Sequence, residues 1–377
     1  MARPIALRAT ATALGAMLAV YAADRAMAPG ALAAEDEGPI LARPPLMEGQ
    51  PTWYLDHIKR KQEKLLDDLG DKRASAAVPS ALVILKTMQW APGATITVAF
   101  NGGNARLRAR IEQFASDWTK YANIKLDFRD ASGKFREWND TDEDYKADVR
   151  VGFENPDNPG YWSSIGKNAT DPDVAQPGAE TLNLQGFDHN LPFGFAGTVR
   201  HEFGHVLGLE HEHQHPLTAC DFRWDDEDGY QPTTNQFGTF IPDKNGRHPG
   251  IYTYMMGPPN KWSKEKIDAN LRQLTEQPDM PLSAFGFGAF DKFSIMKYYY
   301  PDWMFVSGKN SVCYSPNENV DLSEEDRRRI AIYYPKDTAV ATARMRQATQ
   351  AIDKALAGLP QSSLLAKELQ MRRHQLQ

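Results

Sequence analysis

One stretch decides the interpretation of this chain: His201-Glu202-Phe203-Gly204-His205-Val206-Leu207-Gly208-Leu209-Glu210-His211. Its first two histidines are four residues apart, so on a helix both imidazoles project from the same face. Glu202 follows the first histidine, and its carboxylate can reach a water on a metal ion held by the pair. The motif therefore predicts a zinc-binding helix with Glu202 as general base.

The third histidine is predicted to complete the metal site. On a straight helix His211 would lie too far along the axis to share a metal with His201. Gly208 lacks a Cβ and can adopt the positive φ that ends a helix and turns the chain back. His211 then becomes the third protein ligand, and the fourth position is left for water, as in catalytic zinc sites.

The motif H-E-x-x-H-x-x-G-x-x-H resembles the long zinc motif of the metzincin metalloproteases. Metzincins also carry a methionine turn, which Phe293-Ser294-Ile295-Met296-Lys297-Tyr298 resembles. Glu212 and the Ser-Ile-Met-x-Tyr pattern are similar to the astacin-like branch, although Lys297 stands where astacins usually have histidine. Gly204 and the Leu-Gly-Leu segment are similar to matrixins or serralysins. The chain is identified as an astacin-like metzincin of bacterial type, with the subfamily open.

The resemblance implies further roles. Met296 is expected to form an apolar floor under the histidines without binding the metal. Tyr298 is expected to bind zinc at rest and to move to the oxyanion, with Tyr299 and Tyr300 as alternatives if the register differs. In astacins the residue at the position of Glu212 takes part in a buried link to the mature N-terminus. A solvated carboxylate is the alternative here.

The predicted chemistry is hydrolysis of peptide bonds. One Zn²⁺ held by three neutral imidazoles lowers the pKa of bound water from ~16 towards ~7. Glu202 accepts the proton as hydroxide attacks the carbonyl and delivers it to the leaving amine. Zinc and the Tyr298 hydroxyl stabilise the oxyanion. A Ca²⁺ site is compatible with the sequence, although no residue pattern indicates one.

Composition sets limits on the partners. The chain has 377 residues, 41% of them apolar and 24% charged, which is enough for one large or two modest domains. Its net charge of −6 provides neither a basic patch for nucleic acid nor a polybasic membrane anchor. We expect a monomer that acts on a peptide or protein substrate.

The N-terminus resembles a secretory signal peptide. Arg3 and Arg8 precede the apolar run Ala9–Ala23, and small-residue cleavage sites follow. The run is shorter than the about 20 residues that span a bilayer, although a retained anchor is the alternative. Residues 1–34 are therefore predicted to be a signal peptide, and the protein to be secreted or periplasmic, without a membrane anchor after its removal.

Cys220 and Cys313 are the only cysteines. One follows the zinc helix and the other follows the methionine turn, so a bridge would tie together the two segments that build the site. An oxidising compartment would allow this disulfide. Two free thiols remain the alternative, because astacins carry their disulfides at other positions.

The rest of the chain divides into three further parts. Residues 35–80 are either a propeptide that blocks the site or an N-terminal arm, and Leu69-Gly70-Asp71 has a faint similarity to the astacin aspartate switch. Residues 81–335 are predicted to be the catalytic domain. Residues 336–377 are helical by propensity and are predicted to be a C-terminal extension.

The pattern in the catalytic domain predicts an α+β metzincin fold. Its features are a mixed, mostly parallel upper sheet backed by two long helices, and an irregular lower part with the methionine turn and a C-terminal helix. The strands are predicted at 94–100, 124–128, 148–153, 161–166 and 181–184, and the helices at 104–121, 194–207, 262–274 and near 323–334, with 129–146 as a polar surface insertion.

Trp162, Ser163 and Ser164 lie in a segment that resembles the astacin edge strand. Such a strand can pair its free N–H and C=O groups with an extended peptide and so fix the scissile bond over the metal. An ordinary edge strand is the alternative.

Two other classes of function remain. A protein of the same fold could hold zinc and bind peptides or glycans without cleaving them, but the intact Glu202 argues against this. A periplasmic metal-handling protein could use the cluster that ends in His213 and His215, but chelation alone needs neither Gly208 nor a methionine turn. A catalytic zinc leaves no position for these two histidines.

Overall fold

The computed structural model describes residues 47–74, 77, 88–274 and 289–376. All of them belong to one compact unit, Pro44–Gln377. The predicted signal peptide, residues 1–34, lies outside the described residues and stays a prediction. No helix in the described ranges combines the length and the apolar character needed to cross a membrane.

The upper part is a six-stranded sheet. Its order is β2-β1-β4-β6-β5, and β3 pairs with the far half of β1. The strands are β1 (Thr95–Phe100), β2 (Lys125–Asp127), β3 (Arg136–Glu137), β4 (Val149–Gly152), β5 (Tyr161–Ser163) and β6 (Leu182–Leu184). Every pairing is parallel except that of β5 with β6. This confirms the predicted mixed, mostly parallel sheet.

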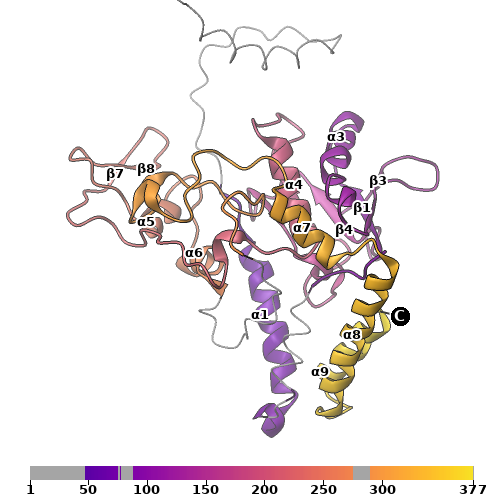
Figure 1. Cartoon of the computed structure of the whole chain (residues 1–377). Helices are drawn as coiled ribbons and strands as arrows, with labels where there is room; N and C mark the ends of the chain where they lie inside the picture. The colour runs from indigo at the N-terminus through magenta and orange to yellow at the C-terminus, as the bar shows by residue number, and fades with distance from the viewer. Residues whose placement is uncertain (1–46, 75–76, 78–87, 275–288, 377) are drawn as a thin grey trace, which may run out of the picture. The chain divides into compact units, whose positions relative to one another are not determined.

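Two helices, α3 (Ala105–Ala115) and α4 (Phe195–Val206), pack together and form the main core with the sheet (Figure 1). The alternation in β1 buries Ile96 and Val98, while α3 begins where the Asn104 side chain accepts a hydrogen bond from the Leu107 N–H. Phe203 of α4 is fully buried in the same core. Sheet and α3 therefore fix the zinc-motif helix from one side.

The prediction of a polar surface insertion at 129–146 is wrong in one respect, because β3 joins the sheet there. Two aromatic residues hold this segment. The Arg129 guanidinium lies 4.0 Å from the Phe135 ring centroid, and Trp138 is buried with its Nε1–H donating to the Val151 carbonyl. Isolated aromatic residues in a charged stretch carry no strand periodicity, so this pairing was not predicted.

The lower part contains little regular structure besides its helices. It includes α5 (Ile251–Met256), α6 (Lys264–Leu271), α7 (Glu324–Tyr333) and the hairpin β7 (Thr233–Thr234) and β8 (Phe240–Ile241). Short 3₁₀ helices lie in several parts of the chain, at Gly70–Ala74, Trp118–Lys120, Gly166–Thr170, Glu212–Gln214, Asp302–Met304 and Gly308–Asn310. Ser323 and Asp326 form the capping box of α7 that their spacing predicts. Cys220 and Cys313 form a disulfide within the core of this part.

A third core joins the two ends of the described chain. Helix α1 (Thr52–Asp67) contributes Leu65, and Leu69 follows it, while α8 (Thr338–Ala357) and α9 (Leu364–His374) contribute residues such as Leu356 and Leu365. Helices α8 and α9 lie side by side (Figure 1). The segment predicted as an N-terminal arm and the C-terminal extension therefore share one apolar cluster, while the proposed domain boundaries stay predictions.

A buried carboxyl group outside the metal motif, that of Glu180, allows the packing beside the sheet to be tested. Its carboxyl group lies against Gly152 of β4 and accepts a hydrogen bond from Asn155 Nδ2 at 2.7 Å. Burial raises the pKa of Glu180 from 4.5 to about 8. The folded state thus favours the protonated form, so this contribution to stability is present below pH 4.5 and is lost as the pH rises through 8.

We expect Glu180→Gln to be more stable than the wild type by about 1–3 kcal/mol near pH 9 and equally stable near pH 4, since glutamine keeps an acceptor for Asn155 without a charge. Urea unfolding across this pH range measures the difference. Glu143→Gln, at an exposed carboxylate, is the matched control. A difference that does not change with pH would contradict the assignment.

Candidate metal centre

The zinc-motif helix ends as its sequence predicts. Helix α4 stops at Val206, and Gly208 adopts a φ of 85°. The Gly208 N–H donates to the His205 carbonyl at 2.8 Å, and the Leu209 N–H donates to the Gly204 carbonyl at 3.0 Å. These bonds close the helix and return the chain, which brings His211 back to the face that carries the first two histidines.

The three histidines present their Nε2 atoms to one point. The Nε2 atoms of His201 and His205 are 3.2 Å apart, and those of His205 and His211 are 3.0 Å apart. All three side chains are buried. Ligand nitrogens at the usual Zn–N distance in a tetrahedral site would be about 3.3 Å apart. The cluster therefore fits a single zinc ion.

The opposite ring nitrogens are all held by acceptors. Nδ1 of His201 lies 2.6 Å from the Ile295 carbonyl, and Nδ1 of His205 lies 2.7 Å from the Leu209 carbonyl. Nδ1 of His211 is 3.2 Å from the side-chain oxygen of Gln214. An acceptor at Nδ1 keeps the proton there and leaves the Nε2 lone pair free for a metal. These acceptors therefore favour, in all three rings, the tautomer that can bind a metal through Nε2.

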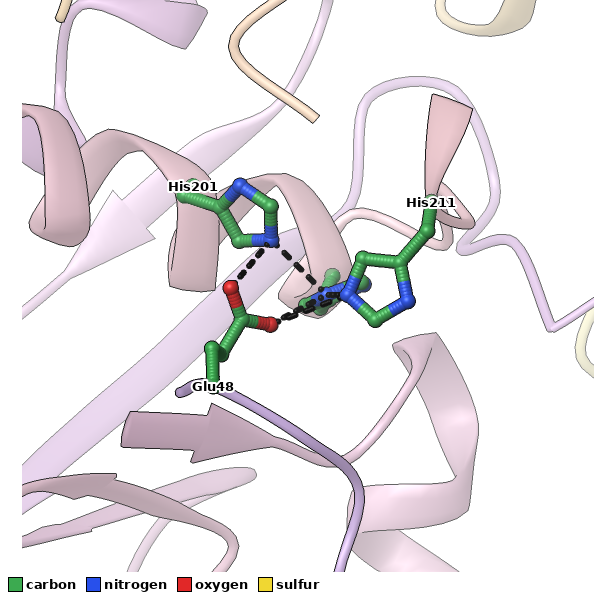
Figure 2. A group of neighbouring side chains, drawn as sticks. Glu48, His201 and His211 are labelled. Atoms are coloured by element: carbon green, nitrogen blue, oxygen red, sulfur yellow. Dashed lines mark hydrogen bonds and ion pairs between the residues drawn. The ribbon is translucent and has the colours of Figure 1, made fainter. Parts of the chain in front are cut away.

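A fourth ligand group comes from Glu48, which precedes α1. Its Oε2 lies 2.8 Å from His201 Nε2, and its Oε1 lies 3.1 and 3.0 Å from the Nε2 atoms of His205 and His211 (Figure 2). The four side chains could together hold a metal ion. Against the opposing effect of burial, the charges of His201 and His211 hold the pKa of Glu48 well below its usual range.

Glu48 was missed by sequence reasoning. It shares no spacing with the zinc motif, and the residue considered as a switch, Asp71, is exposed in the 3₁₀ helix after α1. The only available signal was that residues 35–80 are predicted to be either a propeptide that blocks the site or an N-terminal arm. The structure brings Glu48 into the metal centre and leaves Asp71 outside it.

Glu202 lies inside the site and is fully buried. Neither of its carboxylate oxygens accepts a hydrogen bond from any residue that the structure describes. Burial, and then the negative charge of Glu48, raise the pKa of Glu202 well above its usual range. A buried carboxylate without a protein partner, one residue from a metal ligand, is suited to exchange protons with a water or substrate.

The structure places Tyr298 rather than its neighbours beside the histidines. Its hydroxyl lies 2.6 Å from His211 Nε2, and the ring is buried. Tyr299 is exposed, and Tyr300 packs in the lower core without reaching the metal group. The register in which Tyr298 points to the metal is therefore the one that the fold adopts.

Met296 lies directly beneath the zinc helix. An ideal Cβ on Gly204 would come within 2.2 Å of the Met296 sulfur, so only glycine allows this close approach. The turn is anchored by Asp326, which accepts from Ser294 Oγ at 2.6 Å and from the Ile295 N–H at 2.8 Å. The packing accounts for the glycine in H-E-F-G-H and gives Met296 the position expected of an apolar floor.

Glu212 is neither a solvated carboxylate nor free. It is buried and forms an ion pair with Arg329 of α7 at 2.6 Å, while its Oε1 accepts from the Asp291 N–H at 2.7 Å. His213 Nε2 lies 2.8 Å from the Asn270 carbonyl, and neither His213 nor His215 joins the metal group. These residues attach the segment after His211 to the lower part of the fold.

The predicted edge strand is present and faces the segment that carries Glu48. Trp162 and Ser163 lie in β5, which among the described strands pairs with β6 alone and is antiparallel to it, and Ser164 follows the strand. The Gly49 N–H donates to the Tyr161 carbonyl at 3.3 Å, and Gln50 Nε2 donates to the Ser163 carbonyl at 2.7 Å. Edge carbonyls beside the metal centre thus bind an extended piece of chain.

A helix bearing two histidines and a glutamate, a glycine turn to a third histidine and a methionine turn below them define the metzincin class of zinc metalloproteases. The chain is 31% identical to a solved structure titled "Structure of myroilysin", over 66% of this chain and 97% of that one, with a TM-score of 0.47. A second myroilysin structure is 30% identical over 66% of this chain and 87% of that one, with a TM-score of 0.40.

High choriolytic enzyme 1, a hatching enzyme zinc-protease from Oryzias latipes, is 16% identical over 66% of this chain and 95% of that one, with a TM-score of 0.35. No protein-family model matches the sequence, and no curated protein matches it. On the identity to myroilysin, the chain belongs to the astacin-like metzincins, which are zinc metalloendopeptidases. Zinc is accordingly its cofactor.

Proposed function

We propose that this protein is a secreted or periplasmic endopeptidase that hydrolyses peptide bonds with Glu202 as general base. The observation that carries the proposal is the convergence of three Nε2 atoms beside a buried carboxylate that has no partner in the described structure. His201, His205 and His211 would hold the zinc ion. When bound, zinc lowers the pKa of a water and polarises the scissile carbonyl.

The residues of the chain supply the proton transfers and the alignment. Glu202 would take a proton from the attacking water onto a carboxylate oxygen and pass it to the leaving amine. The Tyr298 hydroxyl, beside His211, would donate a hydrogen bond to the oxyanion.

We propose that β5 aligns the substrate. Its Tyr161 and Ser163 carbonyls already bind an extended segment of this chain beside the metal group. A peptide substrate would use the same carbonyls through its own N–H groups and so lie across the histidines. Ser164 and the buried Trp162 would hold the strand in place rather than contact the substrate.

The segment around Glu48 supports the hypothesis that the N-terminal part blocks the site. Its Met47 and Gln50 N–H groups donate to the side chains of Asn260 and Asn270, so the segment is attached on both sides of Glu48. The group that it places among the histidines is a side-chain carboxylate and not a peptide carbonyl. We propose that the segment occupies the substrate site without presenting a bond for cleavage.

The remaining parts of the proposal concern location and partners. Export through residues 1–34 is supported by the sequence pattern and by the disulfide, which is stable in an oxidising compartment. A monomer without nucleic-acid or membrane partners agrees with the net charge of −6. A zinc-containing peptide- or glycan-binding protein is the alternative function, and the position of Glu202 in the site disfavours it.

Metal removal tests the reaction class. We expect a chelator to abolish cleavage of an unfolded protein by the wild type and by a Glu48→Gln chain, and stoichiometric zinc to restore it, because the three histidines have no other way to act on water. Circular dichroism serves as control, since the apolar cores and the disulfide should keep the chain folded. Cleavage that persists after the zinc has been removed would exclude the proposed mechanism.

A further inference from the structure

A cavity of about 270 Å³ opens beside the metal centre. Its walls include Tyr161 of β5, Thr198 and His201 of α4, Ile295 of the methionine turn and Tyr299 after it, and the segment that carries Glu48. A peptide lying along β5 with its scissile bond at the histidines would place a neighbouring side chain at this cavity. Its lining should therefore contribute to the choice of cleavage site, provided that the proposed function holds.

Glu318 lines the cavity, is exposed to solvent, and forms no ion pair with a lysine or arginine within the part of the chain that the structure describes, although the charge of His201 acts on it. Its Oε2 would lie 3.2 Å from a Cβ on Gly194, the residue that precedes α4, so the carboxylate lies over the positive end of that helix.

Lys297, the lysine in the cavity wall, is already engaged. Its side chain is buried, and the ammonium group donates to the Tyr298 carbonyl at 3.0 Å and to Ser315 Oγ at 3.3 Å. Burial lowers the pKa of Lys297 to about 8, which weakens its positive charge further. Once the segment that carries Glu48 has left the site, the cavity would offer a substrate the carboxylate of Glu318, whereas the ammonium group of Lys297 is directed to the protein.

We propose that this cavity is a specificity subsite for a lysine or arginine side chain next to the scissile bond, with Glu318 as the residue that selects it. The cationic head would meet the carboxylate at the helix end, and the methylene stem would lie against Tyr161 and Ile295. A charge-assisted hydrogen bond to this carboxylate, which a bound peptide would cover, is sufficient for about a tenfold preference over an uncharged side chain of equal length.

The test uses the zinc-loaded full chain with Glu48→Gln and two peptide sets. In each set one residue flanking the scissile bond is lysine, norleucine or glutamate, on one side or the other, and mass spectrometry maps the cut. We expect kcat/KM for lysine to exceed that for norleucine by about tenfold on one side. Glu318→Gln should remove this ratio and Glu318→Lys should invert it towards glutamate. Glu324→Gln, at an exposed carboxylate of the neighbouring helix, should leave the ratio unchanged.

Four results would overturn the inference. Cleavage that favours glutamate in the parent chain would assign the cavity to Lys297 instead. A lysine preference that survives Glu318→Gln would place the selecting group elsewhere. Cleavage without any preference would leave the proposed function intact and refute only the subsite, whereas no cleavage by the zinc-loaded chain would remove the proposed function and the subsite together.

Discussion

Glu202→Gln is expected to lower kcat/KM for peptide cleavage by about 10²–10⁴-fold while zinc stays bound at one ion per chain. Glutamine has nearly the shape of glutamate, so it should fit the same buried position, but its amide cannot accept the proton of the attacking water. The ligands should be unaffected, because each Nδ1 is held by an acceptor other than Glu202. Rate and zinc content can be measured on the same preparation.

The effect is expected to be large because no second base is placed to replace Glu202 among the residues that the structure describes. The other carboxylate at the histidines, Glu48, lies among the Nε2 atoms, and Tyr298 has a pKa raised above its usual range by burial and by the charge of Glu48. Glu143→Gln is the control for loss of a carboxylate. Equal cleavage by wild type and Glu202→Gln would mean that another group is the base or that a contaminating protease is measured.

Glu48→Gln is expected to raise the initial cleavage rate of the intact chain at least about tenfold. Glutamine keeps the size of the side chain but removes the charge that binds the histidine cluster, so the segment should leave the site in a larger fraction of molecules. The observed rate scales with that fraction. The measurement is the initial rate with the N-terminus confirmed intact by mass spectrometry.

Glu63→Gln, at an exposed position on α1 that has no contact with the metal group, should leave the rate unchanged. The gain from Glu48→Gln should also be independent of protein concentration, since a release within one molecule needs no second copy. A Glu48→Gln chain that binds zinc fully and is no faster than the wild type would contradict the blocking role of the segment.

The zinc ligands could be predicted because their geometry is local. A helix period and one glycine with positive φ determine how His201, His205 and His211 meet, and all of them lie in one short stretch. Met296 could be placed only through the family resemblance. The structure adds the physical reason, which is the close approach of its sulfur to Gly204.

The parts that could not be predicted depend on contacts between distant segments. Glu48 reaches the metal group from the other end of the chain, and Arg329 pairs with Glu212 from α7. Neither contact leaves a periodic pattern in the sequence. Tyr298 could not be separated from its two neighbours by spacing alone. Tyr298 and Tyr300 are both buried, and only the fold determines which ring lies beside His211.

The apolar cluster of α1, α8 and α9 can form only late in the synthesis of the chain, because it joins helices that are far apart in the sequence. Helix α1 is synthesised before α8 and α9, which supply apolar partners of Leu65 and Leu69. Contacts between such distant parts form only after α8 and α9 have been made. A chain that stops before α8 would contain the metal motif, but α1 would lack the contacts of this cluster. The proposed block of the site is therefore expected to be weaker in such a truncated chain than in the full chain.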